Sequence, residues 1–393
     1  MAHDTATATR TRLRSDELGF TARLSGIAIS RLLGLFMVLP VMALWADGLP
    51  GATPLLVGVA VGGYGVTQAL LQIPYGVLSD RLGRKPVAAI GLAVFLLGSA
   101  VAAGAEGIWG VIVGRLLQGA GAVSATLSAW LADRTRDEVR TPAMAIFGAA
   151  IGASFLLALV LGPLLAAAVG VRGLFWLSAG FGGLAVLLVL TAPGSTPAAP
   201  SGPRDWSGVM RPDLLAMDGA ILVLHAALTA FFVLAPYLLI NEITLPEHRH
   251  WQVYTVTLAA ALPIAIPLIM RDGREGSRYM LLALALLAGG FILIAAGRSL
   301  WLFGAGCTLF FAGFSYLEAA LPAAMSRRAP AEQRGAALGL FSSSQFFGAF
   351  VGGTAAGAIV GTLGAVAGAM GVAAVLGGWL LLAAFNSQSK HAD

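Results

Sequence analysis

The sequence has little charge and almost no cysteine, and each shortage excludes a class of protein. Cys307 is the single cysteine, so an intramolecular disulfide or a cysteine-based metal cluster is excluded. Charged residues make up only 11% of the chain, whereas soluble domains contain about 25%. Because 58% of the residues are hydrophobic, the chain cannot cover its own surface in water. The composition therefore predicts a protein whose surrounding solvent is the lipid bilayer.

Long apolar runs predict an all-α membrane protein. A helix needs about 20 apolar residues to cross a bilayer. Twelve runs of suitable length lie at residues 22–46, 54–79, 86–104, 108–132, 141–169, 172–192, 217–240, 249–270, 279–297, 299–325, 334–361 and 364–387. We therefore expect twelve transmembrane helices.

The positions of the basic residues predict the orientation of these helices. If both termini are cytoplasmic, most of the 24 Lys and Arg residues lie on the cytoplasmic side, and only Arg172, Arg249 and Arg298 lie outside. This asymmetry follows the positive-inside rule. The net charge of +5 is thus explained by membrane insertion, and no nucleic-acid partner is expected. We expect a multi-pass protein of the inner membrane with both termini in the cytoplasm.

A segment rich in Pro, Gly and Ser, from Thr191 to Asp213, divides the chain into two pseudo-symmetric halves. We predict an N-terminal arm over 1–21, a six-helix half over 22–192, a cytoplasmic linker over 193–216, a second six-helix half over 217–387 and a tail over 388–393. The halves are weakly alike: LADRTRDEVRTPAMAIFG in the first parallels MSRRAPAEQRGAALGLFS in the second. Such repeats place a substrate site near the membrane midplane, between the halves.

The loop after the second predicted helix contains an ordered set of charges, GVLSDRLGRKPV. An acid at the end of a span is costly unless it is paired, and an arginine can bind a carboxylate with two hydrogen bonds. Arg84 and Asp133 are the expected pair. A solvated basic loop would explain Arg81 and Lys85, but not the ordered Asp, Gly and Arg. The ordered residues of this loop are Gly76, Asp80, Arg81, Gly83, Arg84 and Lys85.

This loop resembles the signature of the major facilitator superfamily. Arg115, followed by Gln118 and Gly119, is similar to a motif of that superfamily whose arginine is associated with proton coupling. Nearly the whole chain resembles the YajR-like twelve-helix drug/proton antiporters, on segments that include SRLLGLFMVLPV, YGVTQALLQIPYGVLSDRLGRKP and FSYLEAALP. Gly162-Pro163 matches the centre of an antiporter motif, although alanines replace several of its glycines.

The resemblance implies a conformational latch formed by Gly76, Asp80, Arg81, Gly83, Arg84, Lys85 and Asp133. It also implies particular roles for three of these residues. In that family the acid meets the N-terminus of the eleventh helix and the arginine meets the acid that ends the fourth. These roles fall on Asp80, Arg84 and Asp133. We expect the cytoplasmic C-terminal domain of the better-known members to be absent.

Four ionisable residues lie well inside predicted spans, where charge is expensive and suggests a substrate pathway or a proton relay. Glu318 and His225 are candidates for carrying a proton, and Arg115 and Arg31 for taking part in coupling. Each has a structural alternative. Glu318 could form a hydrogen bond to the opposite half and His225 could be a satisfied interior histidine. Arg31 could neutralise a buried acid or anchor its helix, and Arg115 could form a structural pair.

Polar uncharged residues predict the cavity. Gln68 and Gln72 are four residues apart and share a helix face. The candidate cavity residues are Tyr64, Gln68, Gln72, Gln118 and Gln345. Such groups also tie helices together in lipid. Because they are few and the walls are mainly apolar, a hydrophobic or amphiphilic substrate is expected.

The expected function is secondary active transport. We predict a monomeric exporter that exchanges small molecules for protons by alternating access, driven by the proton gradient, without cofactor or metal. A proton-coupled importer or facilitator of a small metabolite is the alternative. An enzyme is not expected, because the sequence has no HExxH or Walker motif and no GxSxG with a plausible triad.

Overall fold

The computed structural model describes residues 12–194, 208–330 and 333–392, and these residues form helices but no strand. The first half contains α1 (Ser15–Phe36), α2 (Leu39–Asp47), α3 (Pro54–Leu82), α4 (Arg84–Gly104), α5 (Ile108–Ala120), α6 (Ser124–Asp133) and α7 (Asp137–Leu190). The second half contains α8 (Pro212–Asn241), the short 3-10 helix η1 (Glu247–Arg249), α9 (His250–Ala296), α10 (Leu300–Arg328) and α11 (Arg334–Ala392).

Two spans that were predicted as continuous helices are broken. The run at 22–46 is divided into α1 and α2, and Pro40 stands in the first turn of α2. A proline has no N–H to donate and its ring crowds the carbonyl four residues earlier, which agrees with the end of α1 at Phe36. The run at 108–132 is divided at Gly121, whose φ of −76° and ψ of 43° are not helical. The helix that opens the chain also begins at Ser15, within the predicted N-terminal arm.

Within the described residues, ten segments are long and apolar enough to cross a membrane, and two of them are unusually long, Asp137–Leu190 with 54 residues and Arg334–Phe385 with 52. Each contains a glycine with positive φ and non-helical backbone, Gly170 and Gly364. Ser178 Oγ donates to Gly34 O at 2.6 Å, and Gly162 contacts the carbonyl of Met37. Because Met37 is only about one helical turn beyond Gly34, residues 162 and 178 lie close together in space. In a straight helix, residues 162 and 178 would be about 24 Å apart, so α7 reverses at Gly170. The total of twelve helices stays a prediction, which this reversal supports.

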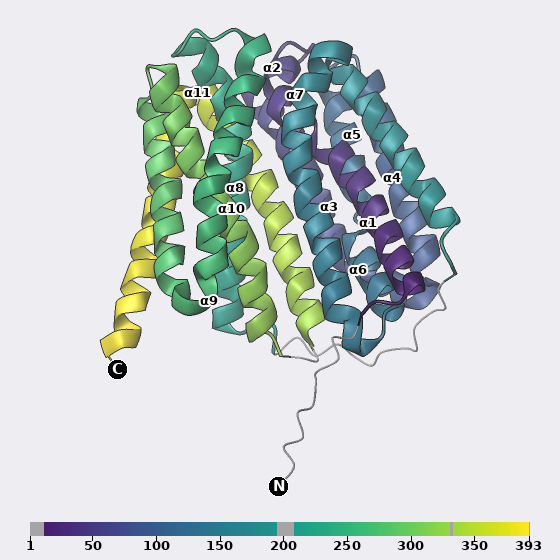
Figure 1. The fold of residues 1–393 in the computed structure, drawn as a ribbon. Helices are drawn as coiled ribbons and strands as arrows, with labels where there is room; N and C mark the ends of the chain where they lie inside the picture. Colours follow the sequence, from purple (N-terminus) through teal and green to yellow (C-terminus); the bar gives the residue numbers. More distant parts are fainter. Residues whose placement is uncertain (1–11, 195–207, 331–332, 393) are drawn as a thin grey trace.

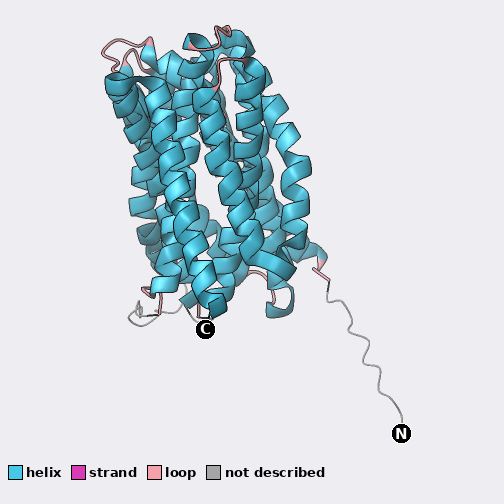
Figure 2. Ribbon diagram, turned by 90° about the vertical axis from the view of Figure 1, so that its left-hand side faces the viewer, coloured by secondary structure: helices cyan, strands magenta, loops and turns pink. Residues whose placement is uncertain are grey.

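The helices form one elongated bundle of two halves (Figure 1; Figure 2). In the first half α7 packs on α1 and α4, and in the second α9 packs on α10 while α8 packs on α11. The most extensive contact between the halves joins α3 to α11. We call the end where α1 begins and α11 ends the base of the bundle, and the opposite end the top (Figure 1).

Glycines let α3 and α11 approach closely near the top. A Cβ atom placed on Gly62 would lie 2.7 Å from Ala349 O, and one placed on Gly353 would lie 2.7 Å from Gly58 O, so a larger residue would clash at either position. Small residues at such spacing allow backbone contact in lipid. Toward the base, Gly76 and Gly339 have no such neighbour within 4 Å. The seam between α3 and α11 is therefore closed at the top in this conformation.

Cysteine labelling tests the predicted orientation. In a Cys307→Ala background, Thr53→Cys at the top and Glu138→Cys at the base both place the thiol at an exposed position. Because the basic residues are expected to be cytoplasmic, a membrane-impermeant maleimide should label position 53 in intact cells and position 138 only after permeabilisation. Labelling of both positions from outside would contradict the orientation.

Candidate functional site

A cluster of charges joins three helices of the first half at the base. Gly83, with φ of 92°, ends α3 and precedes α4, a conformation that glycine adopts without strain. The turn brings Arg84, whose side chain is 8% exposed, against two acids. Its Nε donates to Asp133 Oδ2 at 2.9 Å, and its Nη1 donates to Asp80 Oδ1 and to Ser79 Oγ at 2.7 Å. The predicted pair of Arg84 and Asp133 is confirmed.

The remaining latch residues have different positions. Lys85 Nζ donates to Leu190 O, the last residue of α7, at 2.8 Å and to Ala192 O, just beyond the helix, at 2.9 Å, so it binds at the C-terminal end of α7, where a cation is favourable. Arg81 is exposed, and a Cβ atom placed on Gly76 would have no described neighbour within 4 Å. The contact of Asp80 with the start of α11 stays a prediction, because residues 331–332 before that helix lie outside the described part.

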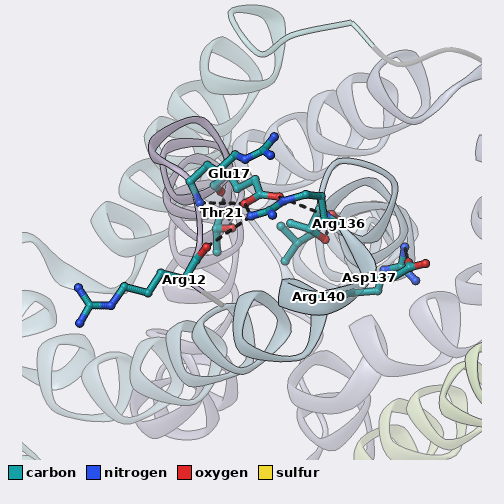
Figure 3. A network of polar contacts seen from close by, with 9 residues as sticks. Arg12, Glu17, Thr21, Arg136, Asp137 and Arg140 are labelled. Carbon is teal, nitrogen blue, oxygen red and sulfur yellow. Dashed lines mark hydrogen bonds and ion pairs between the residues drawn. The ribbon is translucent and has the colours of Figure 1, made fainter. Parts of the chain in front are cut away.

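A second polar network at the base, which the sequence did not indicate, links α1 to the start of α7 (Figure 3). Glu17, whose side chain is 5% exposed, binds Arg136 through both oxygens: Oε1 accepts from Nε at 2.9 Å and Oε2 from Nη2 at 3.0 Å. Arg14 N donates to the same carboxylate at 2.8 Å. Glu17 raises the pKa of Arg136 above its ordinary value through this hydrogen bond. Bidentate geometry makes the pair directional, so the network positions α1 against α7.

Arg115 is fully buried inside the first half and is surrounded by neutral acceptors. Its guanidinium donates to Gln118 Oε1 at 2.8 Å and to the carbonyl of Val61 at 3.1 Å. It also lies 4.5 Å from the ring centroid of Tyr64, within the range of cation–π contacts. No carboxylate among the described residues forms an ion pair with Arg115. The arginine motif therefore ties α5 to α3 through carbonyls and an aromatic ring.

Arg31 is also buried and binds Gln68. Its Nη2 donates to Gln68 Oε1 at 2.8 Å and its Nη1 lies 3.5 Å from Ser124 Oγ. In the described part of the chain no acid pairs with Arg31, so the interpretation that it neutralises one is not supported there. It instead connects α1 to α3 and α6. The other alternative for this residue, anchoring its helix, agrees with these contacts.

Most of the predicted cavity residues are packed inside the first half in this conformation. The buried set comprises Tyr64, Gln68, Gln72 and Gln118. Gln118 Nε2 donates to Ser99 Oγ at 2.9 Å while its oxygen accepts from Arg115, so its amide is used within the protein. Substrate contact by these four residues stays a prediction. Gln345, the fifth, is partly exposed and belongs to a different cluster.

Three helices of the second half bring His225, Glu318 and Gln345 together. Gln345 Nε2 lies 2.8 Å from His225 Nε2 and 3.2 Å from Glu318 Oε1, while Glu318 Oε2 is 3.5 Å from His225 Nε2. Because His225 Nδ1 is 3.3 Å from Ile221 O, a neutral ring with its hydrogen on Nδ1 fits these contacts. One amide nitrogen then donates to both an imidazole and a carboxylate. We call these three residues the acid cluster.

A chain of aromatic contacts connects the acid cluster to the first half. The His225 ring is 5.7 Å from Phe314, and Phe314 is 6.1 Å from Phe155 across the boundary between the halves. Phe36 continues the chain, with its ring centroid 5.2 Å from that of Phe155 and 6.3 Å from that of Tyr64. Sequence reasoning missed this chain, because phenylalanines in apolar helices do not differ in pattern from ordinary packing residues. Among the described residues, no group of His, Cys, Asp and Glu is arranged to hold a metal ion.

Comparisons with known proteins agree with this architecture. A family model described as Major Facilitator Superfamily matches residues 24–271. The inner membrane transport protein YajR of Escherichia coli K12 is 39% identical over 379 residues, which cover 92% of this chain and 82% of that protein. Multidrug resistance protein MdtL of Escherichia coli is 28% identical over 268 residues, 65% of this chain and 68% of that protein. The crystal structure of the human organic anion transporter MFSD10 has a TM-score of 0.70 at 20% identity and covers 94% of this chain and 100% of that one. The chain belongs to the Major Facilitator Superfamily of membrane transporters.

Proposed function

We propose that this transporter is a proton-coupled antiporter of the inner membrane that exports small hydrophobic or amphiphilic compounds. The observation on which the proposal rests is the acid cluster, which lies in the second half beside the aromatic chain that reaches the first. A proton site and an apolar binding surface are thus adjacent at the boundary whose opening and closing defines alternating access.

Glu318 has the properties of an exchangeable proton carrier. Its side chain is 36% exposed, so it faces space that solvent can enter. Its Oε2 is itself buried and has no hydrogen-bond partner among the described residues, so a proton can bind there while Oε1 keeps its hydrogen bond to Gln345. A permanent negative charge inside a membrane protein is costly. Proton binding removes that charge, and the nearby imidazole of His225 can accept or return the proton.

The neighbouring aromatic rings favour an apolar substrate. Phe314 and Phe155 contact each other from opposite halves, and Phe36 and Tyr64 continue this row of rings, in which Phe314 and Tyr64 are buried in the present conformation. Binding sites of this kind recognise apolar and aromatic groups, with a few polar groups for orientation. The similarity to a protein named for multidrug resistance supports the same class of substrate. Proton and substrate would compete for one site, which couples their opposite movements.

Proteoliposomes with an imposed pH gradient test antiport. With ethidium and tetracycline as probes, a gradient should drive uphill movement of at least one probe against the direction of proton flow, and addition of the probe should release protons, detected by pyranine. Dissipating the gradient with a protonophore provides the control. Movement of a probe in the same direction as protons would contradict export and favour the importer.

A further inference from the structure

Asp218 is an acid inside α8 that has no partner in the described structure. The residue is 6% exposed, and neither carboxylate oxygen forms a hydrogen bond. It takes part in no ion pair with any described residue. An unpaired carboxylate anion in such surroundings is strongly unfavourable, whereas the protonated acid is not. Its position therefore favours a group that holds a proton. The sequence did not indicate it, because Asp218 stands at the edge of a predicted span and looks like a boundary charge.

The described side chains of the surrounding elements do not supply a counter-charge. The charged or titratable side chains nearest the base on α8, α10 and α11 are Asp213, His225, Glu318, Arg327, Arg328 and Arg334. At the same end, α9 adds Arg271 and Arg278, and α3 adds Asp80 and Arg81. None of them forms an ion pair or hydrogen bond with Asp218. The basic groups lie at helix ends or, for Arg271 and Arg278, near the middle of α9, while Asp218 lies inside α8.

Asp218 lies on the same side of α8 as the acid cluster. Seven residues separate it from His225, which is two helical turns, so both side chains leave the same face about 10 Å apart along the axis. His225 Nδ1 contacts Ile221 O, in the turn between them. The helix begins at Pro212, so Asp218 is roughly 9 Å from the base end of α8 and His225 roughly 20 Å. Asp218 therefore stands about halfway between the acid cluster and the base.

We propose that Asp218 is the second proton-binding carboxylate of this transporter and relays protons between the acid cluster and the base. The inference rests on the proposed proton-coupled function. Protonated Asp218 first releases its proton to water at the base. The proton on Glu318 Oε2 then passes through water to the carboxylate of Asp218, which is again protonated, and Glu318, left as a carboxylate, takes its next proton from the opposite side of the membrane. Only O–H bonds form and break. A direct hydrogen bond cannot span about 10 Å, so the transfer takes place in a conformation that admits water between the two acids.

Infrared spectroscopy tests proton binding without requiring transport. The purified full-length protein in lipid is compared with Asp218→Asn, Glu318→Gln and Asp213→Asn. Asp213 is the matched control, because it is on the same helix, is paired with Arg211 and is partly exposed. Asp218→Asn should remove a C=O band of a protonated carboxylic acid that remains in Glu318→Gln and in Asp213→Asn. An unchanged carboxylic acid spectrum in Asp218→Asn would overturn the proposal.

Transport tests the relay itself, with whichever of ethidium and tetracycline the wild type exports. Asp218→Asn should slow coupled proton release by about tenfold or more, as expected for loss of a proton-transfer group, while probe binding stays at the wild-type level. Asp218→Glu should restore most of the rate. Coupled proton release in Asp218→Asn equal to that of Asp213→Asn would overturn the relay. If Glu318→Gln still couples probe export fully to proton movement, Glu318 is not the proton carrier and the proposed function fails. The infrared measurement still shows in that case whether Asp218 binds a proton, so the two failures can be told apart.

Discussion

Replacing Glu318 with Gln is expected to reduce gradient-driven efflux to background while leaving downhill exchange of substrate intact. The amide has nearly the shape of the protonated acid and can still accept the hydrogen bond from Gln345, which is 3.2 Å long in the native protein. It cannot bind or release a proton. Each tenfold difference in proton affinity between two conformations supplies about 1.4 kcal/mol of coupling, and the substitution removes this contribution completely. Efflux and counterflow in proteoliposomes measure the two activities.

The matched control for this substitution is Glu106→Gln, which makes the same chemical change at an exposed position between α4 and α5. It should leave both activities at the wild-type level. If Glu318→Gln retains a full response to the pH gradient, the essential proton site lies elsewhere, and His225 and Arg115 become the next residues to test.

The architecture was predictable because it follows from solvation. Apolar runs of the length of a bilayer must be helices in lipid, where every backbone polar group needs a partner within the protein. The pair of Arg84 and Asp133 was also predictable, since an acid at a membrane boundary needs a counter-ion and the ordered loop supplies Arg84. The breaks near Pro40 and at Gly121 were not predicted. Both residue types can end a helix, but the apolar runs continue through them, so the hydrophobic pattern gave no sign of a break.

The details of the polar interior could not be predicted from one sequence. Pairing within the acid cluster depends on the rotation of α8, α10 and α11 relative to one another. The spacing of residues within one helix does not predict that rotation. His225 and Glu318 were expected to matter for proton coupling, whereas the amide of Gln345 that joins them was expected only to line a cavity. Glu17 was missed because it lies in the part of the chain assigned to the N-terminal arm, where an acid in contact with water needs no partner.

Replacing Arg84 with Ala is expected to impair transport strongly without preventing membrane insertion. Its guanidinium, on α4, binds Asp80 and Ser79 of α3 and Asp133 of α6, so its removal leaves two acids without this counter-ion. Hydrogen bonds to charged groups contribute about 1.5–3 kcal/mol each, and a change of 1–3 kcal/mol shifts a balanced conformational equilibrium about 5- to 150-fold. Transport rates, together with accessibility of cysteines introduced at the base, measure the loss and the change in conformational populations.

Arg81→Ala provides the matched control, because Arg81 belongs to the same loop and has the same charge but is exposed. If the loop acted only through its positive charge near the membrane surface, the two substitutions would reduce transport equally. We expect Arg81→Ala to remain near the wild-type rate and Arg84→Lys to recover only part of it, since an ammonium cannot reproduce the planar geometry of the guanidinium. Asp80→Asn should resemble Arg84→Ala in direction, because each removes one side of the same contact at the end of α3. Equal behaviour of Arg84→Ala and Arg81→Ala would show that the ordered pairs at the base do not control the transport cycle.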